Sequence, residues 1–129
     1  MNKKVHIITM GCSKNLVDSE FLSKQLEVNG FITEHDVDNS DAETVLINTC
    51  GFINDAKEES IESILQFSDA KKSGLIKKLY VFGCLSQRYK NELKQEITNV
   101  DGWYGVEDIQ TIIHELSGEF HNQYRLHRR

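Results

Sequence analysis

Short apolar runs alternate along the chain with longer stretches in which apolar residues recur at every third or fourth position. Near-continuous apolar runs of this length are typical of parallel strands that are covered on both faces. The run from Phe31 to Val37 is more polar than the others, so we expect it at an edge of the sheet. The predicted strands cover Lys4–Met10, Phe31–Val37, Thr44–Asn48, Lys78–Phe82 and Val100–Tyr104.

The stretches between these runs have the spacing of amphipathic helices. We expect the first helix to begin with the acidic and capping residues Asp18 and Ser19 and to end at Gly30. The second helix is predicted from about Asp55 to Lys72. The predicted apolar faces comprise Phe21, Leu22, Leu26 and Val28, then Ile61, Ile64, Leu65 and Ser68, then Leu85, Tyr89, Leu93 and Ile97, and finally Ile109, Ile112, Ile113 and Leu116.

This alternation predicts an α/β fold with an open, doubly wound parallel sheet of four to five strands and right-handed crossovers. We expect the flavodoxin-like strand order 2-1-3-4-5. A chain of 129 residues corresponds to a single domain, which we place at residues 1–118, with residues 119–129 as a tail or linker. In that order the first, third and fourth strands are neighbours, and their carboxyl ends meet at one edge of the sheet.

A cysteine with a glycine beside it follows each of these three neighbouring strands, and the chain has no cysteines other than Cys12, Cys50 and Cys84. Adjacent strands lie about 4.8 Å apart, so the outer two of these strand ends would be about 10 Å apart. Side chains that lean inward from there would reach one small metal centre. Soft thiolates near helix N-termini favour an iron–sulphur cluster, and three thiolates would leave one iron of a four-iron cluster without a protein ligand.

The residues alone leave other interpretations of the cysteines open. Each thiol would also suit a small buried hydrophobic position. Zinc usually takes a fourth protein ligand, and we expect His6 and His35 within strands, away from the carboxyl ends. A catalytic thiol would need only one of the cysteines. A flavodoxin-like binding module for phosphate or nucleotide is a further alternative, although neither a P-loop nor GxGxxG follows the first strand.

Charge and hydropathy narrow the range of partners. The formal net charge of −5 argues against direct nucleic-acid binding by this domain, because that function favours clustered Lys and Arg. No apolar run approaches the length of a membrane span, and Met1–Lys4 leads into a strand instead of a signal peptide. We therefore expect a cytoplasmic protein without membrane association. The odd number of cysteines does not favour a disulfide framework.

Three segments that contain the cysteines carry distinctive motifs. They are GCSKNLVDSE at Gly11–Glu20, NTCGFI at Asn48–Ile53 and GCLSQRY at Gly83–Tyr89. Together they resemble the N-terminal domain of the radical S-adenosylmethionine methylthiotransferases, and the likeness extends to about Leu116. Ser-Lys-Asn after Cys12 is typical of the branch that modifies an aspartate of a small-subunit ribosomal protein. The tRNA adenosine branch, which is the alternative, usually has Gln-Met-Asn there.

The resemblance implies that Cys12, Cys50 and Cys84 bind an auxiliary 4Fe-4S cluster that carries the sulphur to be transferred. A separate radical S-adenosylmethionine domain of the same full-length protein would hold a second 4Fe-4S cluster in a CxxxCxxC motif and bind S-adenosylmethionine. The implied substrate is the β-carbon of an aspartate in a small-subunit ribosomal protein.

This chain departs from the family pattern because it contains no CxxxCxxC motif. We therefore expect it to be a fragment of the enzyme, without methylthiotransferase activity on its own. The residues of the family motifs that would support the cysteine loops are Asn15, Asp18, Ser19, Asn48 and Thr49. Helix capping by Asp18 and Ser19, and strand termination by Asn48 and Thr49, are the plainer interpretations of the same residues.

Overall fold

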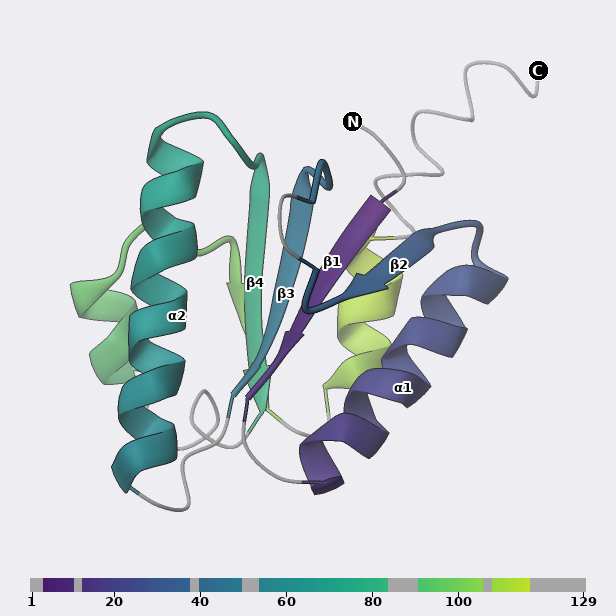
Figure 1. Ribbon diagram of the computed structural model, residues 1–129, viewed down its shortest axis with the longest axis horizontal. Helices are drawn as coiled ribbons and strands as arrows, with labels where there is room; N and C mark the ends of the chain where they lie inside the picture. Colours follow the sequence, from purple (N-terminus) through teal and green to yellow (C-terminus); the bar gives the residue numbers. More distant parts are fainter. Residues whose placement is uncertain are drawn as a thin grey trace.

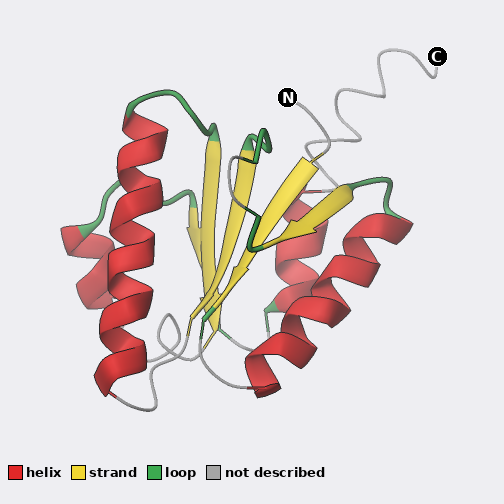
Figure 2. Ribbon diagram, in the orientation of Figure 1, coloured by secondary structure: helices red, strands yellow, loops and turns green. Residues whose placement is uncertain are grey.

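The computed structural model describes residues 4–10, 13–37, 40–49, 54–83, 91–105 and 108–116. These residues form a parallel sheet with helices on both faces (Figures 1 and 2). The sheet has five strands in the order β2-β1-β3-β4-β5. The predicted α/β architecture and strand order are thereby confirmed.

Each strand begins and ends within two residues of its predicted bounds. Every neighbouring pair of strands is parallel. The elements are β1 (Lys4–Thr9), α1 (Ser13–Val28), β2 (Ile32–His35), β3 (Thr44–Thr49), α2 (Asn54–Lys72), β4 (Lys78–Gly83) and β5 (Gly102–Trp103). Residues 91–96 and 109–116 are also helical.

Two apolar layers fill the space between the sheet and its helices, because successive strand residues point to opposite faces. Residues of α1 and of the 109–116 helix pack on one face, and α2 and the 91–96 helix cover the other (Figure 1). The first layer comprises Val5, Ile7, Leu22, Leu26, Phe31, Leu46, Tyr80, Phe82, Ile109, Ile112, Ile113 and Leu116. The second comprises Ile8, Val45, Ile47, Ile64, Ile76, Leu79, Val81, Leu93, Ile97 and Trp103.

The start of α1 was predicted wrongly. The helix begins at Ser13, five residues before Asp18, and its first turn contains no acidic residue. Asp18 and Ser19 therefore lie in the second turn and do not cap the helix. This longer helix keeps the expected stop, because the chain leaves it through Asn29 and Gly30.

The buried face of α1 also differs from the predicted one. Leu22 and Leu26 are fully buried as expected, but Phe21 is 46% exposed and Val28 is 82% exposed. Two serines, Ser19 and Ser23, complete the buried stripe instead. Their hydroxyls are hydrogen-bonded to threonines of the sheet, which offsets the cost of removing them from water.

On the other face, Ile64 and Ser68 of α2 are buried as predicted, whereas Leu65 is 46% exposed. Of the apolar residues predicted for the last two helices, all those that the structure describes are buried. Leu85 and Tyr89 lie outside the described residues. No helix among the described residues combines the length and the apolar composition that crossing a membrane requires.

Candidate metal centre

The carboxyl ends of β1, β3 and β4 lie side by side. Thr9 at the end of β1 pairs with Asn48 of β3, and Thr49 at the end of β3 pairs with Gly83 at the end of β4. Because the three strands are parallel, the chain leaves all of them at the same edge, at the bottom of the view in Figure 1. This is the edge at which open parallel sheets bind their ligands.

The predicted ligands Cys12, Cys50 and Cys84 lie outside the described residues. Each follows the last residue of its strand by one to three positions along the chain. Within the described ranges, no group of three or more His, Cys, Asp and Glu residues is arranged to hold a metal ion. The ligand set therefore stays a prediction, and the described residues around it provide the test of fit.

Helix N-termini provide the first part of this test. α1 begins four residues after the end of β1, and α2 begins five residues after the end of β3. Both helices therefore start at the same edge as the strand ends (Figure 1). The free N–H groups of a helix start carry a partial positive charge, which stabilises anions and lowers the pKa of nearby thiols. The edge thus suits a centre with thiolate ligands.

A chain of hydrogen-bonded polar side chains connects β1, α1 and β3 at this edge. The Oγ1 atom of Thr9 lies 2.7 Å from the Oγ atom of Ser19. The Nδ2 atom of Asn48 donates a hydrogen bond of 3.0 Å to the same Ser19 Oγ. Ser19 and Asn48 are 0% and 1% exposed, so the bond between them is made in the protein interior, whereas Thr9 is half-buried. The structure therefore brings together two of the residues that the motifs singled out.

Thr49 and Gly83 form the contact between the ends of β3 and β4. Thr49 is fully buried, and its Oγ1 atom donates a hydrogen bond of 2.8 Å to the main-chain oxygen of Phe82. Gly83 has a φ angle of +107°, which residues with a side chain rarely adopt. A Cβ atom on Gly83 would lie 2.6 Å from the main-chain oxygen of Thr49 and 2.8 Å from Oδ1 of Asn48. Only glycine lets the two strand ends approach this closely.

The structure gives less information about the other two predicted residues of the motifs, Asn15 and Asp18. Asn15 lies in the first turn of α1, and nothing of its side chain is described. Asp18 is half-buried in the second turn. Thr9 was not among the predicted site residues, although a polar residue at the end of an apolar strand is a signal that could have identified it. Asn48 gave that same signal on the neighbouring strand.

His6 and His35 lie in strands, as predicted, but His35 is the last residue of β2 and so lies at the carboxyl end of its own strand. His6 is buried within β1, where its Nε2 atom accepts a hydrogen bond of 3.0 Å from the main-chain N–H of Val37. Burial lowers the pKa of His6, which favours the neutral ring that this bond needs. His35 pairs with Ile7 in the sheet, short of the end of β1, and its Nε2 atom lies 3.2 Å from Ser23 Oγ.

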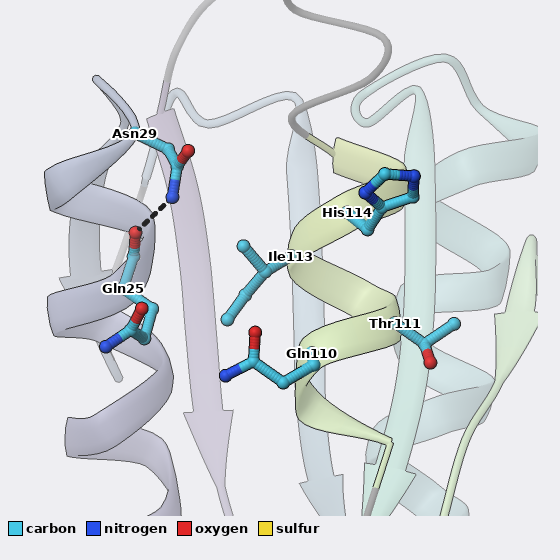
Figure 3. Close-up of a pocket in the computed structure, with 6 residues that line it drawn as sticks. All are labelled: Gln25, Asn29, Gln110, Thr111, Ile113 and His114. Atoms are coloured by element: carbon cyan, nitrogen blue, oxygen red, sulfur yellow. Dashed lines mark hydrogen bonds between the residues drawn. The ribbon is translucent and has the colours of Figure 1, made fainter.

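A groove of about 560 Å³ lies between α1 and the 109–116 helix (Figure 3). Its lining consists of Gln25, Asn29, Gln110, Thr111, Ile113 and His114. Asn29 is held toward α1 because its Nδ2 atom donates a hydrogen bond of 2.8 Å to the main-chain oxygen of Gln25. The groove borders the last turns of α1, whereas the strand ends lie at the first turn. It is therefore not part of the candidate metal centre.

Comparison with known proteins agrees with the motifs. The chain is similar to ribosomal protein uS12 methylthiotransferases RimO from three bacteria. The identity is 52% for Cytophaga hutchinsonii, over 90% of this chain and 28% of the relative. It is 50% for Bacteroides thetaiotaomicron, over 98% of this chain and 29% of the relative. It is 52% for Phocaeicola vulgatus, over 96% of this chain and 29% of the relative. The chain thus spans less than a third of the length of these relatives.

Residues 4–105 match the uncharacterized protein family UPF0004. This range includes all of the strands and the three segments on which the resemblance to methylthiotransferases rested. The names of the relatives confirm that resemblance. The chain belongs to the uncharacterized protein family UPF0004.

Proposed function

We propose that this chain is the cluster-binding N-terminal part of a ribosomal-protein methylthiotransferase. Cys12, Cys50 and Cys84 bind an auxiliary 4Fe-4S cluster in this proposal. The single observation that carries it is the adjacency of β1, β3 and β4, whose carboxyl ends lead directly into the cysteines. The identity of about half the residues with uS12 methylthiotransferases supports the choice of substrate class.

When bound, the cluster would supply sulphur at an iron that has no protein ligand. The residues of this chain have three tasks toward it. The cysteines hold it, the N-termini of α1 and α2 favour its negative charge, and polar residues of α1 and of the end of β3 keep the loops in place. We assign this last task to Asn15, Asp18, Ser19, Asn48 and Thr49.

The rest of the reaction lies outside this chain in the proposal. A radical S-adenosylmethionine domain of the same full-length protein, with a second 4Fe-4S cluster and S-adenosylmethionine, activates the β-carbon of an aspartate in the small-subunit ribosomal protein. Residues 1–118 form the cluster domain, and residues 119–129 lead toward the radical domain. The protein acts in the cytoplasm. The 129-residue chain alone does not modify the ribosomal protein.

The experiment is anaerobic reconstitution of the 129-residue chain with iron and sulphide. We expect a brown protein with the broad visible absorption of an iron–sulphur cluster and about four iron ions per chain. Cys12→Ala, Cys50→Ala and Cys84→Ala should each lose most of the absorption and of the iron. Ser23→Ala serves as the control because it removes a buried hydroxyl of α1 that bonds to β2, away from the cysteine-bearing strands.

A wild-type chain that stays colourless and binds no iron would contradict the proposal. That result would favour a flavodoxin-like module with structural cysteines. Binding that survives each cysteine substitution would contradict the ligand assignment in particular. Incubating the reconstituted chain with uS12 and S-adenosylmethionine should give no methylthiolated peptide by mass spectrometry, and modification under these conditions would refute the assignment of the missing steps to another domain.

A further inference from the structure

Asn48 contacts the chain segments on both sides of the first cysteine loop. It is the penultimate residue of β3, and its side chain is 1% exposed. Its Nδ2 atom donates to Ser19 Oγ in α1, and Ser19 Oγ lies in turn against Thr9 Oγ1 at the end of β1. The main-chain oxygen of Asn48 accepts a hydrogen bond of 2.8 Å from the main-chain N–H of Met10. Cys12 follows two residues later.

The same side chain borders the segments that lead to the other two cysteines. Cys50 is two residues beyond Asn48 on the same strand. Gly83, which immediately precedes Cys84, lies so close that a Cβ atom there would be 2.8 Å from Asn48 Oδ1. Through its side chain and its main chain, the one residue Asn48 therefore bonds to or adjoins all three segments from which the cysteines continue.

The hydrogen bonds of the buried Asn48 amide are costly to break. An Asn in the interior must keep its hydrogen bonds, because an unpaired polar atom costs about 1–3 kcal/mol. Leu46, two residues earlier on the same face of β3, belongs to the apolar core, so an apolar side chain is the ordinary choice on this face. A polar group at the end of the strand, next to a proposed ligand site, is expected where spacing matters more than stability.

We propose that Asn48 is a positioning residue that sets the spacing of the three cysteine-bearing segments before any metal arrives. Ser19 is its partner in this role, since it ties the amide to α1 and β1. The inference rests on the proposed function for the identity of the bound group. It goes beyond that function in stating that Asn48 and Ser19 fix the spacing of these segments in the metal-free chain.

Two measurements on Asn48→Leu and Ser19→Ala test the inference. The first is the rate at which a short bifunctional thiol reagent cross-links pairs of cysteines within the metal-free, reduced chain. The second is the rate at which a chelator removes iron from the reconstituted chain. We expect slower cross-linking and iron loss that is about tenfold faster or more, as is typical when groups that orient metal ligands are removed.

Ser23→Ala is the matched control. Ser23 lies one helical turn after Ser19 on the same buried stripe, and its Oγ atom lies 2.6 Å from Thr33 Oγ1 of β2. The substitution deletes the same hydroxyl from the same helix, but its partner strand leads to no cysteine. Both rates should therefore match those of the wild-type chain, while circular dichroism and urea unfolding verify that each variant folds.

Wild-type rates in folded Asn48→Leu and Ser19→Ala would overturn the inference, as would equal effects of Ser19→Ala and Ser23→Ala. If Asn48→Leu does not fold, the smaller deletion in Ser19→Ala decides the question. The two measurements also separate this inference from the proposed function. A chain that binds no iron refutes the proposed function, whereas cross-linking in the metal-free chain still reports whether Asn48 and Ser19 set the spacing.

Discussion

Gly83 offers the sharpest test of how closely β3 and β4 approach at the candidate metal centre. In Gly83→Ala, the new methyl group would lie 2.6 Å from the main-chain oxygen of Thr49 and 2.9 Å from its main-chain nitrogen. These atoms belong to the backbone of a buried strand and cannot move aside as a flexible side chain would. The residue would also have to keep a φ angle of +107°.

The expected cost is the sum of two effects. An alanine held at such a backbone conformation is strained by about 1–3 kcal/mol. Forcing a methyl group into an already packed site costs about 1–3 kcal/mol more. Gly83→Ala should therefore lower the free energy of unfolding by about 2–6 kcal/mol, a large share of the roughly 5–15 kcal/mol that stabilises a typical domain.

Gly74→Ala provides the matched control for this experiment. Gly74 also has a positive φ angle, +82°, but a Cβ atom there would have nothing within 4 Å. Its substitution should cost only the backbone strain, about 1–2 kcal/mol. Urea denaturation of both variants measures the difference, provided that the slopes agree with the wild-type slope. A Gly83→Ala variant no less stable than Gly74→Ala would refute the close approach of the strand ends.

Three further predictions concern residues outside this edge. Burial lowers the pKa of His6 below its ordinary value of 6.5. In mildly acidic solution the unfolded chain therefore binds more protons than the folded one, and the free energy of unfolding should fall as the pH drops below about 6.5. The fall should be smaller in His6→Gln, and equal pH profiles in urea denaturation would contradict the burial of a neutral ring. Leu22→Ala should cost about 2–5 kcal/mol, whereas Phe21→Ala should cost less than about 1 kcal/mol; equal losses in thermal or urea unfolding would contradict the orientation of α1. Asp101→Ala should destabilise the chain more than Lys71→Ala, because the Asp101 carboxylate accepts hydrogen bonds both from Lys71 at 2.7 Å and from a main-chain N–H of β4 at 2.8 Å. Equal losses in urea unfolding would show that the ion pair dominates and would contradict this prediction.

The sheet could be predicted from the sequence because its signals are local. A strand such as β3 is buried at every position, so its sequence is apolar from Val45 to Ile47 without alternation. Connections that contain whole helices then require parallel pairing and right-handed crossovers. These two rules lead to the observed order without knowledge of any single contact.

The face of α1 could not be predicted in the same way. Hydrophobicity assigns Phe21 to the core and Ser19 to a cap, because it considers each side chain without its partner. In the folded chain Ser19 finds a hydroxyl on Thr9 and an amide on Asn48, and both lie far from it in the sequence or on another element. Phe21 is 46% exposed because the buried stripe of α1 runs through the serines Ser19 and Ser23 as well as through Leu22 and Leu26.

The candidate metal centre combines both kinds of information. Its location follows from the strand order, which the sequence predicts. The contact between Gly83 and Asn48 could not be predicted, because it depends on the register of β3 against β4 and on a positive φ angle at one residue. The motifs around the cysteines singled out Ser19 and Asn48 among other residues, but they did not reveal that these two side chains meet.

The strand order itself determines whether the cysteine-bearing segments can cooperate. If the strands were arranged in chain order, β2 would separate β1 from β3, and the ends of β1 and β4 would be about 14 Å apart instead of about 10 Å. The observed order avoids this because β2 lies at the outer edge, so β1 and β3 pair directly. β2 is also the shorter and more exposed neighbour of β1, and no cysteine follows it before β3. The connection that moves β2 outward is therefore what brings the ends of β1, β3 and β4 within reach of one small ligand.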